Sequence, residues 1–272
     1  MGELDEDAFS ELLQDEPDEA LSLLADMAAA TDEGLRRLAR SLAGRIFTDL
    51  ARRGVATRSG AARLTPARAD VSEGDLDLER SLDHLIESRT TGRAVDASEL
   101  IVSTWRRPDT ALCLLVDRSG SMQGARLATA AISAAAALYS RTTDSSVVAF
   151  ADEPIVLKEQ TSDRRASDVV GDLLTLRGSG VTNLAAALRA ARSQLACSAA
   201  PRKVTIVLSD CRVTSGGDAV PAAQMLDEIV VLAPAEDSAD AEDFATRVGC
   251  RWAPLAGATQ APTAITQLLS PT

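Results

Sequence analysis

The sequence predicts an α/β protein built on a doubly wound, mostly parallel β-sheet. Two observations in residues 109–272 lead to this prediction. Short apolar runs alternate with longer runs that have helical spacing, an order that is typical of strands joined by crossover helices. The apolar runs are also continuous, rather than alternating with polar residues, which indicates strands that are buried on both faces.

Residues 1–53 are predicted to form a small helical region before the sheet. The first thirty residues carry ten acidic residues and no basic one, and their apolar residues fall at helical spacing on either side of Pro17. Residues 33–53 then switch to a basic amphipathic pattern. We interpret the region as acidic and basic helices that face each other. The alternative is that the acidic helices dock on a basic surface of a partner.

Residues 54–108 are interpreted as a linker and a helix that lead into the sheet. Residues 54–75 contain Gly, Ser, Thr and Pro with few large apolar residues, which is typical of a loop. Residues 76–88 have helical spacing and include His84, the only histidine. A single histidine on a helix is usually a surface or packing residue, so we assign it no catalytic or ligand role.

Residues 109–272 provide the strands and helices of the sheet. The strand-like segments are 111–117, 146–150, 154–158, 203–210, 228–234 and, more weakly, 251–257. The helix-like segments are 125–140, 163–175, 183–196, about 219–227, 239–248 and 260–269. The sequence ADEP at 151–154 predicts a hairpin turn, so one edge strand is expected to be antiparallel. This is a Rossmann-like architecture, in which binding sites form at the carboxyl ends of the strands.

Composition excludes several classes of protein. The net charge of -12 argues against binding to nucleic acid, which needs a basic surface. The chain begins with the acidic sequence MGELDEDAF and has no apolar run of about 18 residues, so we expect a cytoplasmic protein without membrane insertion. The four cysteines are far apart, which favours reduced thiols over a metal site or disulfides.

The segment DRSGS at 117–121 directly follows the first apolar strand. In an extended loop, side chains two residues apart point the same way, so Asp117, Ser119 and Ser121 can converge on one point. Gly120 allows the backbone to bend between them. The segment therefore predicts a cluster of oxygen donors at a strand end.

Two further segments bring oxygen donors to the same edge of the sheet. Thr182 follows the glycines of RGSGVTNL at 177–184, and Asp210 ends the strand-like run VTIVLSD. Carboxylates and hydroxyls are hard donors that suit Mg²⁺, Mn²⁺ or Ca²⁺. Two carboxylates and three hydroxyls leave part of the charge of a divalent ion unsatisfied, so such a site can accept a carboxylate from another molecule.

This pattern resembles the metal-ion-dependent adhesion site of von Willebrand factor A (VWA) domains over about residues 109–270. The resemblance implies that a divalent ion, most simply Mg²⁺, is held by Asp117, Ser119, Ser121, Thr182 and Asp210. It also implies that a partner protein completes the ion's shell with a Glu or Asp side chain. A rim that contacts this partner would include Met122, Asp152, Val181 and Cys211.

The sequence departs from the VWA pattern at two of these rim positions. Cys211 follows Asp210 where relatives often have glycine, and Val181 precedes Thr182 where glycine is also common. Neither change removes a predicted ligand. A small buried cysteine is a more common situation than a reactive one.

The strand entry TWRRPDTALCLLVDRSGSM is similar to bacterial intracellular VWA proteins, including CoxE-like proteins and the D subunit of magnesium chelatase. Such proteins commonly work with a MoxR-type or related AAA+ ATPase in metal-centre insertion or the remodelling of complexes. The resemblance therefore implies an adaptor or substrate-recognition partner of an ATPase. This step is an analogy within the family.

Two alternatives to a binding module remain open. The first is a metal-dependent hydrolase or phosphotransferase that uses Asp117, Ser119 and Ser121. Against this alternative, the sheet region has no histidine to act as a base, no GxSxG segment and no GxxxxGK[ST] loop. The second is a degenerate VWA scaffold in which the same residues serve only turns and helix caps.

Overall fold

The computed structural model describes residues 6–28, 43, 46–47, 64–68, 75–105, 110–118, 125–139, 144–162, 164–176 and 180–269. The chain forms two compact units. The first unit joins Met1–Arg58 to Asp109–Thr272, and the second unit consists of Ser59–Pro108. The N-terminal helices therefore belong to the same unit as the large sheet.

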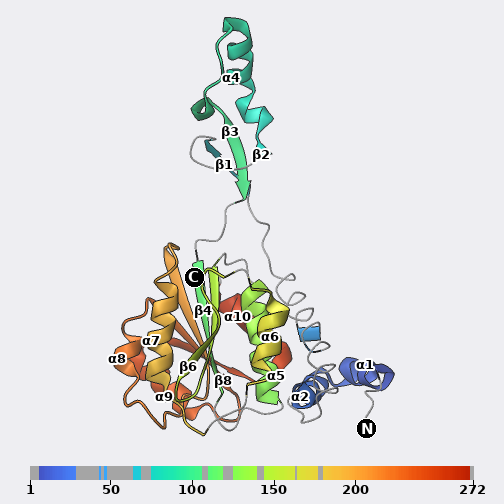
Figure 1. The fold of residues 1–272 in the computed structure, drawn as a ribbon, viewed down its shortest axis with the longest axis vertical. Helices are drawn as coiled ribbons and strands as arrows, with labels where there is room; N and C mark the ends of the chain where they lie inside the picture. The colour runs from blue at the N-terminus through green and yellow to red at the C-terminus, as the bar shows by residue number, and fades with distance from the viewer. Residues whose placement is uncertain are drawn as a thin grey trace. The chain divides into compact units, whose positions relative to one another are not determined.

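The first unit contains a six-stranded sheet of order β6-β5-β4-β7-β8-β9, with helices on both faces (Figure 1). Five strands are parallel, and the edge strand β6 runs antiparallel to β5. The strands are β4 (Thr110–Asp117), β5 (Asp144–Phe150), β6 (Pro154–Lys158), β7 (Arg202–Leu208), β8 (Glu228–Pro234) and β9 (Arg251–Leu255). The predicted fold class, including the antiparallel edge, is confirmed.

The two faces of the sheet form separate hydrophobic cores because successive side chains of a strand point in opposite directions. In β4, Leu112, Leu114 and Val116 pack with α5 (Ala125–Tyr139), α6 (Ala166–Leu173) and α10 (Ala261–Leu269). The intervening side chains of β4 pack with α7 (Leu184–Leu195), α8 (Val220–Ala223) and α9 (Ala239–Val248). The side chains of β4 from Ala111 to Val116 are therefore apolar on both faces of the sheet, which explains the uninterrupted hydrophobic run in the sequence.

The predicted helices agree with the structure except at their ends. Helix α8 spans only Val220–Ala223, which is shorter than the predicted segment 219–227. Pro221 lies in its first turn, where proline is favoured. The helix is short because the chain turns toward β8 directly after Ala223. Strand β7 ends at Leu208, so Ser209 and Asp210 lie in the loop that follows it.

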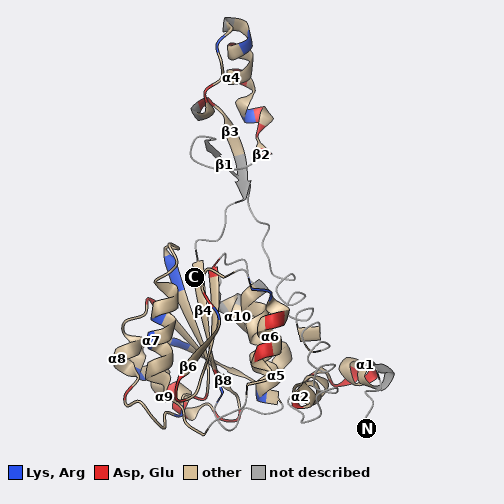
Figure 2. Ribbon diagram, viewed as in Figure 1, with Lys and Arg blue, Asp and Glu red and all other residues tan. Residues whose placement is uncertain are grey.

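The acidic N-terminal helices pack on the large sheet domain. Helices α1 (Glu6–Asp15) and α2 (Pro17–Ala28) have acidic and no basic side chains (Figure 2). Apolar residues of both helices, including Phe9, Leu21 and Leu24, are buried in the core formed with α5. Most of the basic segment 33–53, which was expected to face these helices, lies outside the described residues.

Asp18 of α2 attaches this helix to the C-terminal part of the fold. Its carboxylate accepts hydrogen bonds from the backbone N–H of Thr259 at 2.9 Å and from the Thr259 hydroxyl at 3.1 Å. Thr259 lies in the short 3₁₀ helix η2 (Ala258–Gln260). The neighbouring Gly257 leaves room for this contact, since a Cβ there would lie 2.3 Å from the Asp18 carboxylate.

The second unit is a three-stranded antiparallel sheet of order β1-β3-β2 with one α-helix. The strands are β1 (Leu64–Arg68), β2 (Asp75–Leu76) and β3 (Ile101–Trp105), and the helix is α4 (Leu78–Thr91), followed by the 3₁₀ helix η1 (Ala97–Glu99). The predicted helix at 76–88 is thus confirmed. Asp77 caps the start of α4, where its carboxylate accepts a hydrogen bond from the Arg80 N–H at 3.1 Å.

The prediction of a loop over 54–75 was wrong where β1 and β2 form. Strand β1 contains Pro66, which cannot donate to a sheet and is tolerated because β1 is an edge strand. The strand exists because its backbone pairs with β3, thirty-odd residues further along the chain. Composition within a short window does not report such a pairing.

No described helix is both long enough and apolar enough to cross a membrane.

Replacing Asp18 with alanine tests the attachment of α2. We expect the free energy of unfolding to fall by about 1–2 kcal/mol, because two hydrogen bonds to a charged acceptor are lost. Asp15→Ala, which removes an exposed acid at the end of α1, is the matched control and should stay within about 0.5 kcal/mol of the parent. Urea denaturation measures both, and equal effects would contradict the role given to Asp18.

Candidate functional site

The site lies where the direction of winding reverses. The chain passes from β4 to β5 on one side and returns to β7 on the other side of β4. In open α/β sheets, a crevice forms at this point outside the carboxyl ends of the strands. Val116 of β4 pairs with Leu208 of β7, so Asp117 at the end of β4 and Ser209 just after β7 lie side by side at the crevice.

Asp117 is buried and is oriented by Ser209. The Ser209 hydroxyl donates a hydrogen bond of 2.6 Å to Asp117 Oδ2 and accepts one of 2.9 Å from the backbone N–H of Cys211. Only 2% of Asp117 is exposed. Ser209 therefore joins the end of β4 to the loop after β7 and fixes one oxygen of the carboxylate.

Asp210 is the second buried carboxylate of the crevice, with 8% exposed. Its Oδ1 accepts a hydrogen bond of 3.0 Å from the backbone N–H of Arg212. Its Oδ2 lies 3.8 Å from a guanidinium nitrogen of Arg126, a residue in the first turn of α5. Asp117 and Asp210 line the same small cavity of about 70 Å³, together with Arg126 and Ser209.

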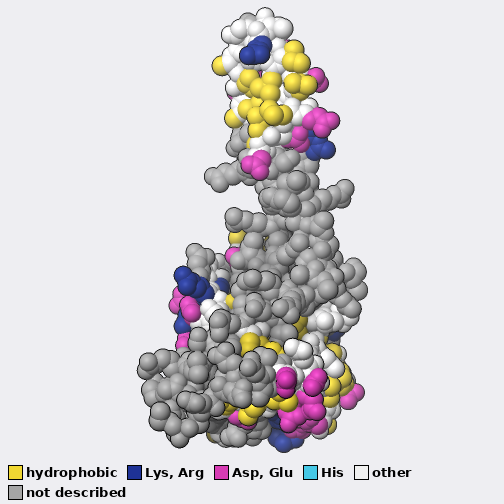
Figure 3. Space-filling view, turned by 90° about the vertical axis from the view of Figure 1, so that its right-hand side faces the viewer, with side chains coloured by type: hydrophobic (Ala, Val, Ile, Leu, Met, Phe, Trp, Pro, Cys, Tyr) yellow, Lys and Arg dark blue, Asp and Glu magenta, His cyan; other side chains and the backbone are white. Residues whose placement is uncertain are grey.

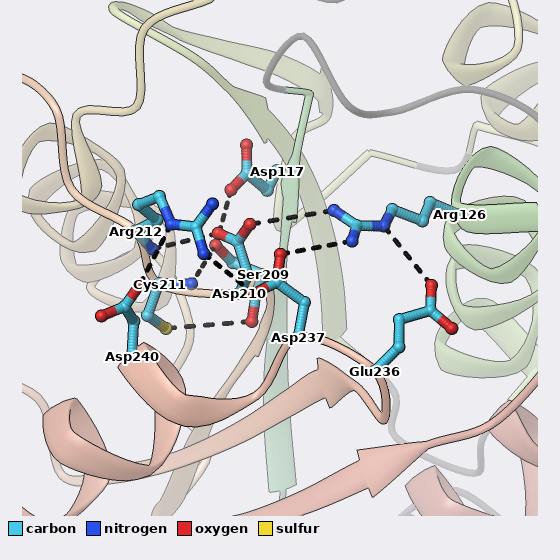
Figure 4. Close-up of polar contacts among 9 residues, drawn as sticks. All are labelled: Asp117, Arg126, Ser209, Asp210, Cys211, Arg212, Glu236, Asp237 and Asp240. Atoms are coloured by element: carbon cyan, nitrogen blue, oxygen red, sulfur yellow. Dashed lines mark hydrogen bonds and ion pairs between the residues drawn. The ribbon is translucent and has the colours of Figure 1, made fainter.

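Two arginines connect Asp210 to the loop after β8 (Figure 4). Arg126 lies 3.3 Å from Asp237 and 4.0 Å from Glu236, while Arg212 reaches Asp237 at 2.9 Å and Asp240 at 3.1 Å. The bond with Asp240, with the charge of Asp237, raises the pKa of Arg212 above its ordinary value. The residues drawn in Figure 4 contain five carboxylates and two guanidinium groups, an excess of negative charge that suits a cation.

Thr182 is held against the loop that contains Asp210. Its backbone N–H donates to the Thr214 hydroxyl at 2.8 Å, and its carbonyl accepts from the backbone N–H groups of Thr214 and Ser215 at 3.1 and 3.2 Å. Only 3% of Thr182 is exposed. Its hydroxyl makes no hydrogen bond with any described residue, which leaves this oxygen available to a ligand.

The start of α7 packs closely on the same loop. Asn183 caps α7, where its side-chain oxygen accepts a hydrogen bond of 3.0 Å from the Ala186 N–H. Gly216 has φ 80°, and a Cβ at this position would lie 2.0 Å from that oxygen. Glycine is therefore required at position 216 by both its backbone conformation and the space available.

The other predicted site residues divide into described and undescribed positions. Ser119, Ser121 and Met122 lie outside the described residues. Asp152 is exposed and accepts a hydrogen bond of 3.1 Å from the Ser215 hydroxyl, and Val181 is 37% exposed. The segment of Asp152 runs beside the segment of Thr182, since the Asn183 N–H donates to the carbonyl of Ala151 at 2.7 Å.

Cys211 differs from the rim residues Asp152 and Val181 because it is buried, with 4% exposed. It adopts φ 60°, a left-handed conformation that is uncommon for a residue with a side chain. This geometry gives a physical reason for glycine at the same position in relatives. Burial, followed by the charges of Asp117 and Asp210, raises the pKa of its thiol, which disfavours the reactive thiolate.

The donor chemistry fits a divalent ion. Two buried carboxylates, Asp117 and Asp210, line the cavity, and the buried Thr182 lies against the loop that follows Asp210. The remaining predicted donors are the two undescribed serines. Hydroxyl and carboxylate oxygens are the ligands that Mg²⁺ and Mn²⁺ accept. Within the part of the chain that the structure describes, no group of three or more His, Cys, Asp or Glu could hold a metal, so any such site depends on the hydroxyl donors.

The fold and this crevice define an α/β protein of the VWA class. Residues 48–236 match the model of the family described as "VWA domain containing CoxE-like protein". The match spans more than half of the chain, and the chain belongs to this family. No curated protein matches the chain.

Solved structures with a similar fold come from several organisms. The manganese-loaded TRAP protein of Plasmodium vivax is 20% identical over 60% of this chain and 74% of that chain, with a TM-score of 0.48. An aerotolerance-related membrane protein of Bacteroides fragilis is 18% identical over 58% of this chain and 96% of its own, with a TM-score of 0.47. A von Willebrand factor type A protein of Catenulispora acidiphila is 16% identical, over 62% of this chain and 42% of its own, with a TM-score of 0.46.

Sequence reasoning missed several residues at or beside the crevice, among them Ser209, Arg126 and Thr214. Ser209 was visible as the residue before Asp210, but it was counted as part of the strand. Arg126 gave no local signal, because arginine is common in this chain and its partners are about 84 to 111 residues away. Thr214 lies in a loop whose path only the folded chain reveals.

Replacing Ser209 with alanine tests the bond that orients Asp117. We expect the free energy of unfolding to fall by about 1–3 kcal/mol, because the buried Asp117 carboxylate and the Cys211 N–H each lose a hydrogen bond. Ser133 offers a matched control, since it is also fully buried but its hydroxyl has no hydrogen-bond partner. Ser133→Ala should be neutral or stabilising in the same urea titration, and a loss as large as that of Ser209→Ala would contradict the assignment.

Proposed function

We propose that this protein is a divalent-metal-dependent protein-binding module rather than an enzyme. The observation that carries the proposal is that two buried carboxylates, Asp117 and Asp210, line one small cavity at the switch point of a VWA sheet. The buried Thr182 is bonded to the loop that follows Asp210, and we propose that its hydroxyl joins them. In this proposal Ser119 and Ser121 complete the donor set. The ion is Mg²⁺, or Mn²⁺ or Ca²⁺ in its place.

The residues of the chain have distinct parts in this proposal. Ser209 holds Asp117 in position, and the Arg212 N–H holds Asp210, so both carboxylates are oriented before any ligand arrives. When bound, the ion supplies positive charge and an open position for an oxygen ligand. The arginines beside Asp210 are paired with acids of the β8–α9 loop, which keeps the crevice negative overall.

The ligand that we propose is a Glu or Asp side chain of a partner protein. Two carboxylates and neutral hydroxyls leave room in the shell of a hard divalent ion for a further anionic oxygen. Met122, Asp152, Val181 and Cys211 are proposed to surround this contact. The exposed residues Asp152 and Val181 offer more surface to a partner than the buried Cys211.

The partner that we propose is an AAA+ ATPase of the MoxR type, which this chain serves as an adaptor or substrate-recognition subunit. Support comes from membership of the CoxE-like family and from the resemblance of the strand entry to bacterial intracellular VWA proteins. A cytoplasmic setting is part of the same proposal. The process would be metal-centre insertion or the remodelling of a complex.

Calorimetric titration with Mg²⁺ and Mn²⁺ tests the metal site. Asp117→Ala and Thr182→Ala should each weaken binding by about 10–100-fold, because each removes an oxygen ligand or the residue that places one. Asp168→Ala, which removes an exposed acid of α6, should leave the isotherm unchanged. Equal binding by all four proteins would contradict the proposed ligands.

Co-purification with a MoxR-type ATPase, expressed with this chain, tests the proposed partner. We expect the complex to dissociate in EDTA, to reform with Mg²⁺, and to fail with Asp117→Ala, because the contact depends on a carboxylate bound through the ion. Asp168→Ala again serves as the control. A complex that withstands EDTA would show that the metal site does not hold the ATPase.

A further inference from the structure

Helix α4 of the second unit exposes an apolar stripe that no described residue of this unit covers. Leu78, Leu82 and Ile86 are spaced four residues apart, so they lie on one side of the helix, and their side chains are 64%, 50% and 52% exposed. Leu76 of β2, just before the helix, is 43% exposed. We call these four residues the α4 stripe.

A different side of α4 faces the small sheet. Ser81 is fully buried, its hydroxyl donates to the carbonyl of Ile101 at 3.2 Å, and it accepts from the Ile101 N–H at 2.9 Å. This pair of bonds fixes the rotation of the helix on β3. Because Ser81 attaches α4 to β3, the α4 stripe is directed away from the sheet. Its exposure follows from the orientation of the whole helix.

Few of the side chains that the structure describes in the second unit are buried. Between residues 75 and 102, only Ser81 and Val102 are buried among the side chains that the structure describes. A small sheet with one helix normally depends on an apolar face packed against a helix. Here four larger apolar residues lie in the exposed stripe, which is the pattern of a surface that binds another protein.

A row of acids runs along one edge of the α4 stripe. Glu79, Asp83 and Glu87 each follow a stripe residue by one position, and all three are exposed. Figure 3 shows hydrophobic side chains of this unit gathered on one face, with acidic side chains beside them and basic side chains at the end of the face and next to the acids. The basic Arg80 is paired with Asp77, outside the acidic row. Such an edge favours a ligand that carries positive charge next to its apolar contacts.

This charge pattern distinguishes between possible occupants. A second copy of α4, packed antiparallel through the stripe about a twofold axis, would bring the two acidic rows against each other. Like charges at such positions oppose the pairing. A helix with leucine-like anchors and a flank of Lys or Arg satisfies both the stripe and its edge.

We propose that the α4 stripe binds an amphipathic helix with a basic flank, supplied by a partner protein. This contact is separate from the Asp117 crevice and does not depend on a metal ion. The second unit thus gives the chain a docking surface of its own, with specificity from the acidic row and contact area from the leucines.

Two short helical peptides test the proposal on the full chain, in EDTA so that the metal site does not contribute. Both peptides carry the same leucine stripe, and the flanks are Lys in one and Glu in the other. We expect the Lys-flanked peptide to bind about tenfold more tightly than its twin in fluorescence anisotropy. Leu82→Asp should weaken its binding by about tenfold or more, since a charge enters the centre of the stripe.

Matched variants separate the stripe from the general negative charge of the protein. Changing Glu79, Asp83 and Glu87 to Lys should reverse the preference between the peptides. The same change at Glu11, Asp15 and Glu19, which are exposed acids of α1 and α2, should leave it in place. Leu23→Asp is the matched control for Leu82→Asp, since Leu23 of α2 is also exposed, at 46%. It should leave the affinity for the Lys-flanked peptide unchanged.

Four outcomes would overturn the proposal. Equal effects of the two triple variants would assign binding to overall charge, and an unchanged affinity of Leu82→Asp would exclude the stripe. A dimer in analytical ultracentrifugation that Leu82→Asp dissociates would assign the stripe to a second copy. A photo-crosslinker at position 82 that reacts with residues 109–272 of the same chain would assign it to an internal contact.

Discussion

The hydrogen bond from the Ser209 hydroxyl to the Asp117 carboxylate is the interaction on which the crevice depends. It crosses from β7 to β4 at the point where the direction of winding reverses, just beyond the last pair in register, Val116 and Leu208. The same hydroxyl accepts from the Cys211 N–H, which directs the following loop back over the strand ends. Asp210 and Thr214 then take their positions along this loop, and Thr214 in turn holds Thr182. The buried Ser209 therefore links the end of β4 to the loop after β7, and Thr214 of this loop in turn holds the segment that contains Thr182.

Charge has to be balanced once these acids converge. Asp117 and Asp210 are buried, and buried carboxylates are costly unless they accept hydrogen bonds or face positive charge. The chain meets this requirement with hydrogen bonds from Ser209 and from a backbone N–H, and with arginines that are themselves shared with acids of the β8–α9 loop. Because Arg126 and Arg212 divide their charge among several partners, neither neutralises Asp210 fully. The crevice thereby keeps its attraction for a cation.

The sheet could be predicted from the sequence because its strands are buried on both faces, which turns β4, β7 and β8 into continuous apolar runs. Asp117 and Asp210 could be predicted as crevice residues because they end such runs. The small sheet of the second unit could not, since β1 is an edge strand with a proline and exists only through its pairing with β3. Arg126 could not be predicted for a related reason: its role arises from partners that only the tertiary fold brings near. Local sequence patterns predict the burial of a strand well, but they do not predict strand pairs or ion pairs between distant parts of the chain.

The division of the chain into two compact units has a consequence for spectroscopy. The chain has only two tryptophans: Trp105 lies in β3 of the second unit and Trp252 lies in β9 of the first. Each unit thus contains its own tryptophan, and replacing either tryptophan with phenylalanine leaves tryptophan emission from one unit alone. Unfolding curves of such single-tryptophan proteins can reveal whether the units melt together or in sequence, a distinction that a single midpoint for the whole chain conceals.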